Sequence, residues 1–155
     1  MLRLYRLGTL AAPDPAPEGR ARIADASDLP LVRAWFTAFA IEIHDRVPGD
    51  EAMRDRVAQG GVVLWEDGAG RAVALAAFSP EVGGASRIGP VYTPPEQRRR
   101  GYAAGVTHAA VGAARAAGAS EVLLFADTAN PTSTGVYLRL GFRPVEDRAV
   151  VVPAA

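Results

Sequence analysis

The 155-residue chain contains no cysteine and no lysine, so its 17 Lys/Arg-type side chains are all arginines. Without cysteine the chain cannot form disulfides, thiolate metal sites or a covalent intermediate on a thiol. Without lysine it cannot form a Schiff base on a lysine amine, and it cannot complete the P-loop pattern, which places a lysine on the phosphates. These two absent residue types therefore exclude several large classes of enzyme.

Net charge and long apolar runs are also absent. The formal net charge of +0 gives no support for nucleic acid or an anionic membrane as a partner. No apolar run approaches the roughly 18 residues that span a membrane, and Arg6 interrupts any signal-like core at the start. His44 and His108 are far apart and lack metal-ligand spacing. We expect a cytoplasmic protein with no metal, no nucleic-acid partner and no membrane partner.

The length and the hydrophobic content of 49% suit one compact domain. Residues 2–10 have the composition of a short strand, and three prolines between residues 13 and 17 are typical of an extended linker. We therefore predict an N-terminal extension with a Pro-rich linker at residues 1–19, outside the core, and one domain at residues 20–155.

Hydrophobic periodicity predicts strands and helices that alternate along the domain. The predicted strands cover about residues 21–24, 62–65, 72–78, 86–93 and 121–126, with one or two closing strands within 142–152. The predicted helices begin near Leu29 and Asp50 and cover residues 101–117 and 132–140. Gly89-Pro90 cannot make regular ladder bonds, so we expect a bulge or a splay within residues 86–93.

Residues 91–103 carry the strongest functional signal. A short strand is stopped by two prolines, and three arginines and Gly101 then precede an Ala-rich amphipathic run. The first N–H groups of a helix have no partner within it, and that end of the helix is positive. Cations gathered there are unfavourable unless an anion binds among them, and phosphate is the natural candidate. A solvated basic turn is the alternative explanation.

Two motifs resemble those of the GNAT superfamily, the acyl-CoA-dependent N-acetyltransferases. Residues 98–103 form an Arg-x-x-Gly-x-Ala pattern similar to the pyrophosphate-binding motif of that superfamily, whereas no Gly-x-Gly-x-x-Gly dinucleotide fingerprint is present. Residues 130–142 resemble its Asn-x-x-Ala-x-x-x-Tyr-x-x-x-Gly-Phe pattern, with Ser133 in place of alanine. One helix and one strand lie between the motifs, as the resemblance requires.

The resemblance implies an α/β (α+β) fold with a mixed central sheet of six to seven strands, flanked by about four helices. Its two central strands splay apart, and the thioester end of acetyl-CoA lies in the gap. The co-substrate would contact the backbone of the splayed strand, the arginine loop and the start of the last helix. The residues concerned are Val91, Tyr92, Thr93, Arg98, Arg99, Arg100, Gly101, Tyr102, Ala103 and Asn130. One of the three arginines is expected to face solvent or to reach the 3′-phosphate.

For catalysis the resemblance places Tyr137 near the sulfur of CoA, where its hydroxyl either protonates or hydrogen-bonds the leaving thiolate. The alternative is a ring that only packs and a hydroxyl that bonds a backbone carbonyl. Asn130 has a second possible role as the cap of the short helix. For the general base we name Glu81 first, because it follows the strand beside Gly89-Pro90, and then Asp127 and Glu42. An ordered chain of water is the alternative base.

We therefore expect an N-acetyltransferase that moves an acetyl group from acetyl-CoA directly to a primary amine of a small-molecule or peptide acceptor, without a cysteine intermediate. The alternatives are a CoA-binding module without catalysis, a degenerate acetyltransferase domain, and a nucleotide-phosphate binder unrelated to CoA. Trp35, Phe36 and Phe39 either form an ordinary core stripe or line the acceptor pocket. A last strand at residues 149–152 is a candidate for pairing across a homodimer.

Overall fold

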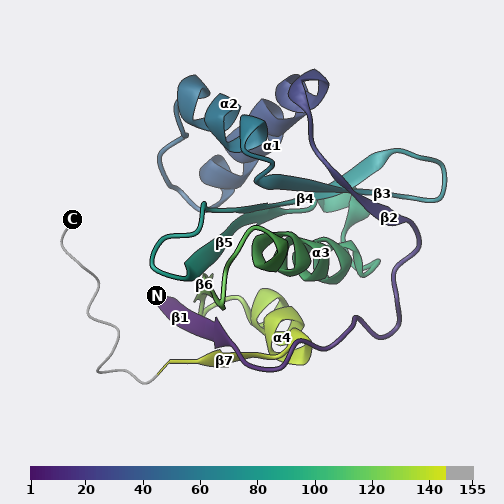
Figure 1. The fold of residues 1–155 in the computed structure, drawn as a ribbon. Coiled ribbons are helices and arrows are strands. Elements are labelled where there is room, and N and C mark those ends of the chain that lie inside the picture. The colour runs from purple at the N-terminus through teal and green to yellow at the C-terminus, as the bar shows by residue number, and fades with distance from the viewer. Residues whose placement is uncertain (146–155) are drawn as a thin grey trace.

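The computed structural model describes residues 1–145, which form seven strands, four α-helices and two short 3-10 turns (Figure 1). Each element predicted between residues 21 and 142 is present, with ends that differ by about one residue. The predicted closing strand at residues 149–152 lies outside the described residues. The order is β1 Leu2–Leu7, β2 Arg20–Ile23, η1 Ala26–Asp28, α1 Leu29–Glu42, α2 Asp50–Ala58, β3 Val62–Glu66, β4 Ala72–Phe78, β5 Ala85–Tyr92, η2 Pro95–Gln97, α3 Tyr102–Ala116, β6 Glu121–Asp127, α4 Pro131–Leu140 and β7 Phe142–Pro144.

The strands form one mixed sheet in the order β2-β3-β4-β5-β6-β1-β7. Only β5 and β6 are parallel; the other neighbouring pairs are antiparallel. Helices α1 and α2 lie on one face of the sheet and α3 and α4 on the other (Figure 1). The expected mixed sheet of six to seven strands with about four helices is therefore confirmed.

Each helical layer covers its own buried cluster, because side chains alternate across a strand. On β4, Leu75 and Ala77 belong to the cluster beneath α1 and α2, which also buries Val32 and Phe36. Ala76 and Phe78 belong to the cluster beneath α3 and α4, together with Val106, Leu124 and Phe142. Phe36 is thus a core residue.

Strand β1 lies inside the sheet, between β6 and β7. Leu4 pairs with Phe125 of β6, and Leu7 pairs with Phe142 of β7. The predicted N-terminal strand is therefore present, but the expectation that residues 1–19 lie outside the core needs correction. The alternation of β1 buries Tyr5 among the core residues beneath α3 and α4, so the sheet contains strands from both sides of the expected boundary.

The two parallel strands part halfway along their length. Their pairing runs from Ala85 with Glu121 to Ile88 with Leu124, although β5 continues to Tyr92 and β6 to Asp127. Where they part, the register between β4 and β5 shifts opposite Gly89-Pro90. Proline has no N–H to donate, so a regular ladder cannot continue through it. The structure contains both the predicted bulge and the predicted splay.

The Pro-rich segment before β2 packs against α3 near its start. An ideal Cβ on Gly105 would lie 2.7 Å from Pro17 Cγ and 3.1 Å from two ring atoms of Trp65. The indole Nε1 of Trp65 donates to the Glu18 carbonyl at 2.7 Å, which holds this segment in place. Two turns further along α3, nothing lies within 4 Å of a Cβ built on Gly112.

We predict opposite effects of alanine at these two positions of α3. G112A should raise the free energy of unfolding by about 0.4–1 kcal/mol, because alanine has the higher helix propensity and the site is open. G105A should lower it by about 1–3 kcal/mol despite the same gain in propensity, because the methyl group overpacks Pro17 and Trp65. Urea denaturation measures both, and stabilisation by G105A would contradict the close contact.

Candidate functional site

The arginine loop connects the splayed end of β5 to the start of α3. Pro95–Gln97 form a 3-10 turn, and Arg99 follows with a φ of 67°. Gly101, the N-cap of α3, has a φ of 83°, which glycine adopts without the cost that a side chain incurs. The loop therefore reverses direction within a few residues and presents its backbone at the N-terminus of a 15-residue helix.

Backbone donors gather in this loop. The N–H groups of Gln97 and Arg98 bond the carbonyls of Pro94 and Pro95, but the N–H groups of residues 99–104 donate to no acceptor within the described chain. They lie at the positive end of the α3 macrodipole. An anion with several oxygens, such as a pyrophosphate, satisfies donors arranged in this way.

The guanidinium of Arg98 is bound to other groups of the chain. Its Nε donates to the Thr93 carbonyl at 2.8 Å, and its Nη2 donates to both carboxylate oxygens of Glu42 at 3.0 and 2.7 Å. Its guanidinium carbon lies 5.8 Å from the centre of the Tyr92 ring. Arg98 thus fastens the loop to the last residue of α1. Arg99 and Arg100 are exposed and form no ion pair with any described residue.

The end of β5 is turned toward α1. The ring of Tyr92 lies 6.1 Å from that of Trp35 at an angle of 52° between their planes. Burial raises the pKa of Tyr92. Helix α1 is thus connected to the arginine loop through two contacts, Trp35 with Tyr92 and Glu42 with Arg98. The Trp35 side chain is half-buried in its contact with Tyr92 and is not fully in the core.

Thr93 is the first residue after β5 and is 8% exposed. Its carbonyl accepts the hydrogen bond from Arg98, while its buried Oγ1 has no hydrogen-bond partner among the described residues. A buried hydroxyl without a partner is costly unless a bound group satisfies it. Thr93 therefore offers a polar contact at the splayed end of β5, and this fits the amide-rich arm of CoA that the resemblance implies.

The second motif forms α4. Asn130 is its N-cap: the side-chain oxygen accepts from the Ser133 N–H at 3.2 Å, so the capping role is present. The half-buried ring of Tyr137 packs edge-on against Phe142, with 6.1 Å between ring centres. Its hydroxyl bonds no group within the described chain, so the ring packs but the alternative bond to a backbone carbonyl is not formed. Burial raises the pKa of Tyr137 to about 12.

Each of the three carboxylates named as a candidate general base is bound to another group of the chain. Glu81 lies in the loop before β5, at the opposite end of that strand from the arginine loop, and its Oε2 accepts from the Gly84 N–H at 2.5 Å. The structure does not bring it to the site. Asp127 ends β6, where hydrogen bonds from the Ala129 N–H and the Met1 amino group lower its pKa. Glu42 binds Arg98.

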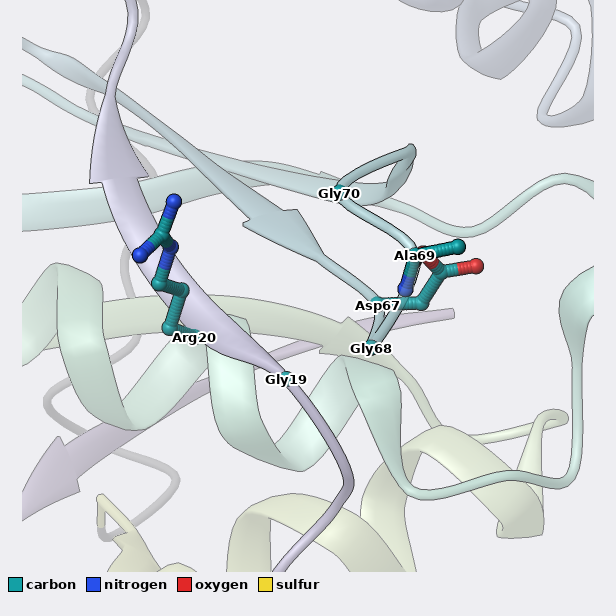
Figure 2. A pocket seen from close by; sticks show the side chains of 6 residues that line it. All are labelled: Gly19, Arg20, Asp67, Gly68, Ala69 and Gly70. Atoms are coloured by element: carbon teal, nitrogen blue, oxygen red, sulfur yellow. The ribbon is translucent and has the colours of Figure 1, made fainter.

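One surface hollow lies elsewhere. It encloses about 480 Å³ between Gly19-Arg20 and the turn of residues 67–70 (Figure 2). The side chains of Arg20 and Asp67 point away from one another there, and the Asp67 carboxylate accepts from two N–H groups of its own turn. None of the predicted site residues lines this hollow. Within residues 1–145, no cluster of three or more His, Asp or Glu side chains is placed to hold a metal ion, and no helix is long and apolar enough to cross a membrane.

The model of the acetyltransferase (GNAT) family matches residues 29–142. The chain belongs to this family. The match includes both motifs and the splayed strand that lies before them.

Solved structures of the family share the fold. A GCN5-related N-acetyltransferase from Sphaerobacter thermophilus has 20% identity and a TM-score of 0.72, over 93% of this chain and 48% of its own. One from Kribbella flavida has 25% identity and a TM-score of 0.68, over 92% and 53%. A Mycobacterium tuberculosis protein in complex with CoA has 18% identity and a TM-score of 0.65, over 81% and 72%. The chain spans about half the length of the first two. No curated protein matches it.

Replacing Glu42 by glutamine tests the role of Arg98, because two roles predict opposite signs. If the ion pair holds Arg98 on the Thr93 carbonyl, E42Q loosens the loop and weakens CoA binding by about twofold to fivefold, as expected for a part-exposed ion pair. If Arg98 acts as a phosphate ligand, E42Q frees its charge and tightens binding. Calorimetric titration with CoA measures the dissociation constant.

The matched control is E121Q, which removes the similarly exposed ion pair of Arg6 and Glu121 at a distance from the loop. Its dissociation constant for CoA should equal that of the wild type. Tighter binding by E42Q, or equal weakening by both variants, contradicts a positioning role for Arg98.

Proposed function

We propose that this chain transfers an acetyl group from acetyl-CoA to a primary amine by direct transfer. One observation carries the proposal: backbone donors without acceptors at the start of α3 lie next to the gap between β5 and β6. In this proposal the donors bind a pyrophosphate, and an extended arm runs from there through the gap toward Tyr137 on α4. CoA in the M. tuberculosis relative supports the same co-substrate here.

Each binding residue has a defined task in this proposal. The N–H groups of residues 99–104 bind the pyrophosphate, and Arg99 and Arg100 add positive charge near it. The Thr93 hydroxyl bonds a polar group of the pantetheine arm. Arg98 is a positioning residue, because it binds the Thr93 carbonyl and holds the loop rather than binding a phosphate. Acetyl-CoA itself supplies the activated thioester.

In the transfer, the amine nitrogen forms a bond to the acetyl carbon, the C–S bond breaks and the amine loses a proton. Tyr137 stays protonated at neutral pH, because its pKa is about 12. Complete proton transfer to a thiolate whose acid has a pKa of about 8.5 is uphill by ~5 kcal/mol. Tyr137 therefore stabilises the leaving thiolate by donating a hydrogen bond, and the proton of the amine leaves through water.

A CoA-binding module without catalysis is the second candidate. The observation in its favour is that Glu42, Glu81 and Asp127 are each bound to another group of the chain. Loss of the thioester in the presence of amines separates the two functions. Three expectations stay predictions: that the acceptor is a small molecule or a peptide, that the protein is cytoplasmic, and that it forms a homodimer.

Thermal unfolding tests the co-substrate. Acetyl-CoA at about 100 times its dissociation constant should stabilise the protein by ~2.7 kcal/mol, which raises Tm by roughly 5–10 °C for a chain of this size. ATP and NAD are the controls for a binder of nucleotide phosphates unrelated to CoA. An equal shift with ATP, or no shift with millimolar acetyl-CoA, overturns the proposal.

Y137F tests the hydroxyl of α4. We expect kcat to fall by about tenfold to a hundredfold, as for a lost hydrogen bond to a charged group, while the dissociation constant of acetyl-CoA stays within about twofold. Because burial raises the pKa of Tyr137 to about 12, the wild-type rate should not fall as pH rises through 10.

The matched control is Y5F, which removes the hydroxyl of a tyrosine buried in the core at 4% exposure. Its kcat should equal that of the wild type. An unchanged kcat in Y137F, or a loss of rate near pH 10 that Y137F abolishes, contradicts the assigned role and protonation state.

A further inference from the structure

Part of one face of the sheet, over β6 and β1, carries no helix-covered cluster within residues 1–145. On β6, Val122, Leu124 and Ala126 point toward α3 and α4 and are buried, so Leu123 and Phe125 point the other way. The cluster beneath α1 and α2 takes no residue from β6, β1 or β7. Leu2 of β1, on this same face, is 64% exposed. We call this surface the open face. It runs from β5 to β1 on the side of the sheet opposite α3 and α4.

Arg87 lies on the open face where the splay begins. It pairs with Leu123 across the two parallel strands, and its guanidinium carbon lies 5.8 Å from the centre of the Phe125 ring. Phe125 is the first residue of β6 after Leu124, at which pairing with β5 ends. The guanidinium thus leans along the open face toward the gap.

Arg56, from the last turn of α2, brings a second cation to this region. It is half-buried, and its Cδ would lie 2.6 Å from a Cβ on Gly61, the residue before β3. Gly61 accepts from the Phe78 N–H. The next residue, Ser79, donates its N–H to the Arg87 carbonyl, so Arg56 lies near Arg87. Burial and then the charge of Arg87 lower the pKa of Arg56. Two neighbouring like charges, one of them partly desolvated, are unfavourable unless an anion binds them.

Four carboxylates around the open face are bound to other groups of the chain. Glu121 of β6 pairs with Arg6 at 3.2 Å, and Asp127 bonds the Met1 amino group at 3.2 Å. Glu42 pairs with Arg98, and Glu81 accepts from the Gly84 N–H. Neither Arg56 nor Arg87 forms an ion pair within residues 1–145. The open face therefore has positive charge beside the gap.

The anion that suits this position is not a phosphate of the co-substrate, whose proposed site lies on the other side of the sheet at the start of α3. The acceptor must reach the gap from the side that the co-substrate does not use, which is the open face. We propose that Arg87, assisted by Arg56, binds a carboxylate of the acceptor, so that the acceptor is an amine that also carries a carboxylate, as an α-amino acid does. The inference rests on the proposed function.

The geometry also gives the acceptor its orientation. Guanidinium groups bind carboxylates through paired, charge-assisted hydrogen bonds, so Arg87 fixes the direction as well as the position of the bound group. A carboxylate held beside Phe125 leaves the neighbouring amine facing the gap. The same charge repels polycationic amines. An apolar side chain of the acceptor would rest on Leu123 and Phe125.

The test uses product-like probes, so that it does not depend on turnover. Protein saturated with CoA is titrated calorimetrically with N-acetyl-leucine, N-acetyl-phenylalanine and N-acetyl-methionine, each paired with its own carboxamide. At least one carboxylate should bind roughly tenfold or more tightly than its amide, as expected for a charge-assisted pair. R87Q should remove the preference, and R56Q should reduce it severalfold.

The matched control is R115Q, which removes an exposed arginine on α3, on the other side of the sheet. It should retain the full preference, and unfolding midpoints confirm that the variants are folded. Equal binding of all carboxylates and amides, or a preference that survives in R87Q, overturns the inference. Failure of the wild type to bind CoA overturns the proposed function instead, so the two failures are distinguishable.

Discussion

The early end of the ladder between β5 and β6 is the constraint on which the rest of the site depends. Regular pairing to the ends of both strands would close the sheet between its two faces. Gly89-Pro90 prevents this, because proline offers no N–H and the register with β4 shifts beside it. The strands then diverge, with α3 beginning at one side of the gap and Arg87 at the other. A local defect in hydrogen bonding thus creates a place where groups bound on opposite faces of the sheet could meet.

A gap of this kind is useful only if its edges are held. The arginine loop contains Arg99 with a positive φ, a conformation that costs a non-glycine residue about 1–3 kcal/mol. Contacts elsewhere must compensate for that cost. Arg98 provides them by bonding the Thr93 carbonyl and Glu42 together, and Tyr92 adds its contact with Trp35. The edge of the gap is therefore supported by α1, the helix on the opposite layer, so the two layers of the molecule are coupled at the site.

The sequence predicts the features that depend on residues close to one another in the chain, but not those that depend on distant residues. The element order, the splay and the N-cap at Asn130 follow from patterns within a few residues: alternation, a Gly-Pro step and a capping side chain. The ion pair of Glu42 and Arg98 joins residues 56 positions apart, and nothing near either residue indicates the other. The same holds for β1, whose slot between β6 and β7 depends on partners at the far end of the chain. Glu81 was favoured because it follows β4, the strand beside the bulge, but it lies in the loop before β5, at the opposite end of β5 from the arginine loop.

The absence of lysine and the zero net charge acquire a physical meaning in this arrangement. Arginine is planar and always charged, so a position filled by arginine keeps both its charge and its fork of donors at any physiological pH. In this chain such side chains serve three tasks around one gap: Arg98 holds the loop, Arg99 and Arg100 lie beside the backbone donors, and Arg87 faces the opposite side. Acidic residues elsewhere balance the total, and several of them form ion pairs, for example Glu121 with Arg6. The net charge of a protein therefore says little about the charge of its site. What matters is which cations lack an ion pair within residues 1–145. Near the gap those are Arg99 and Arg100 at the start of α3, and Arg87 and Arg56 on the open face.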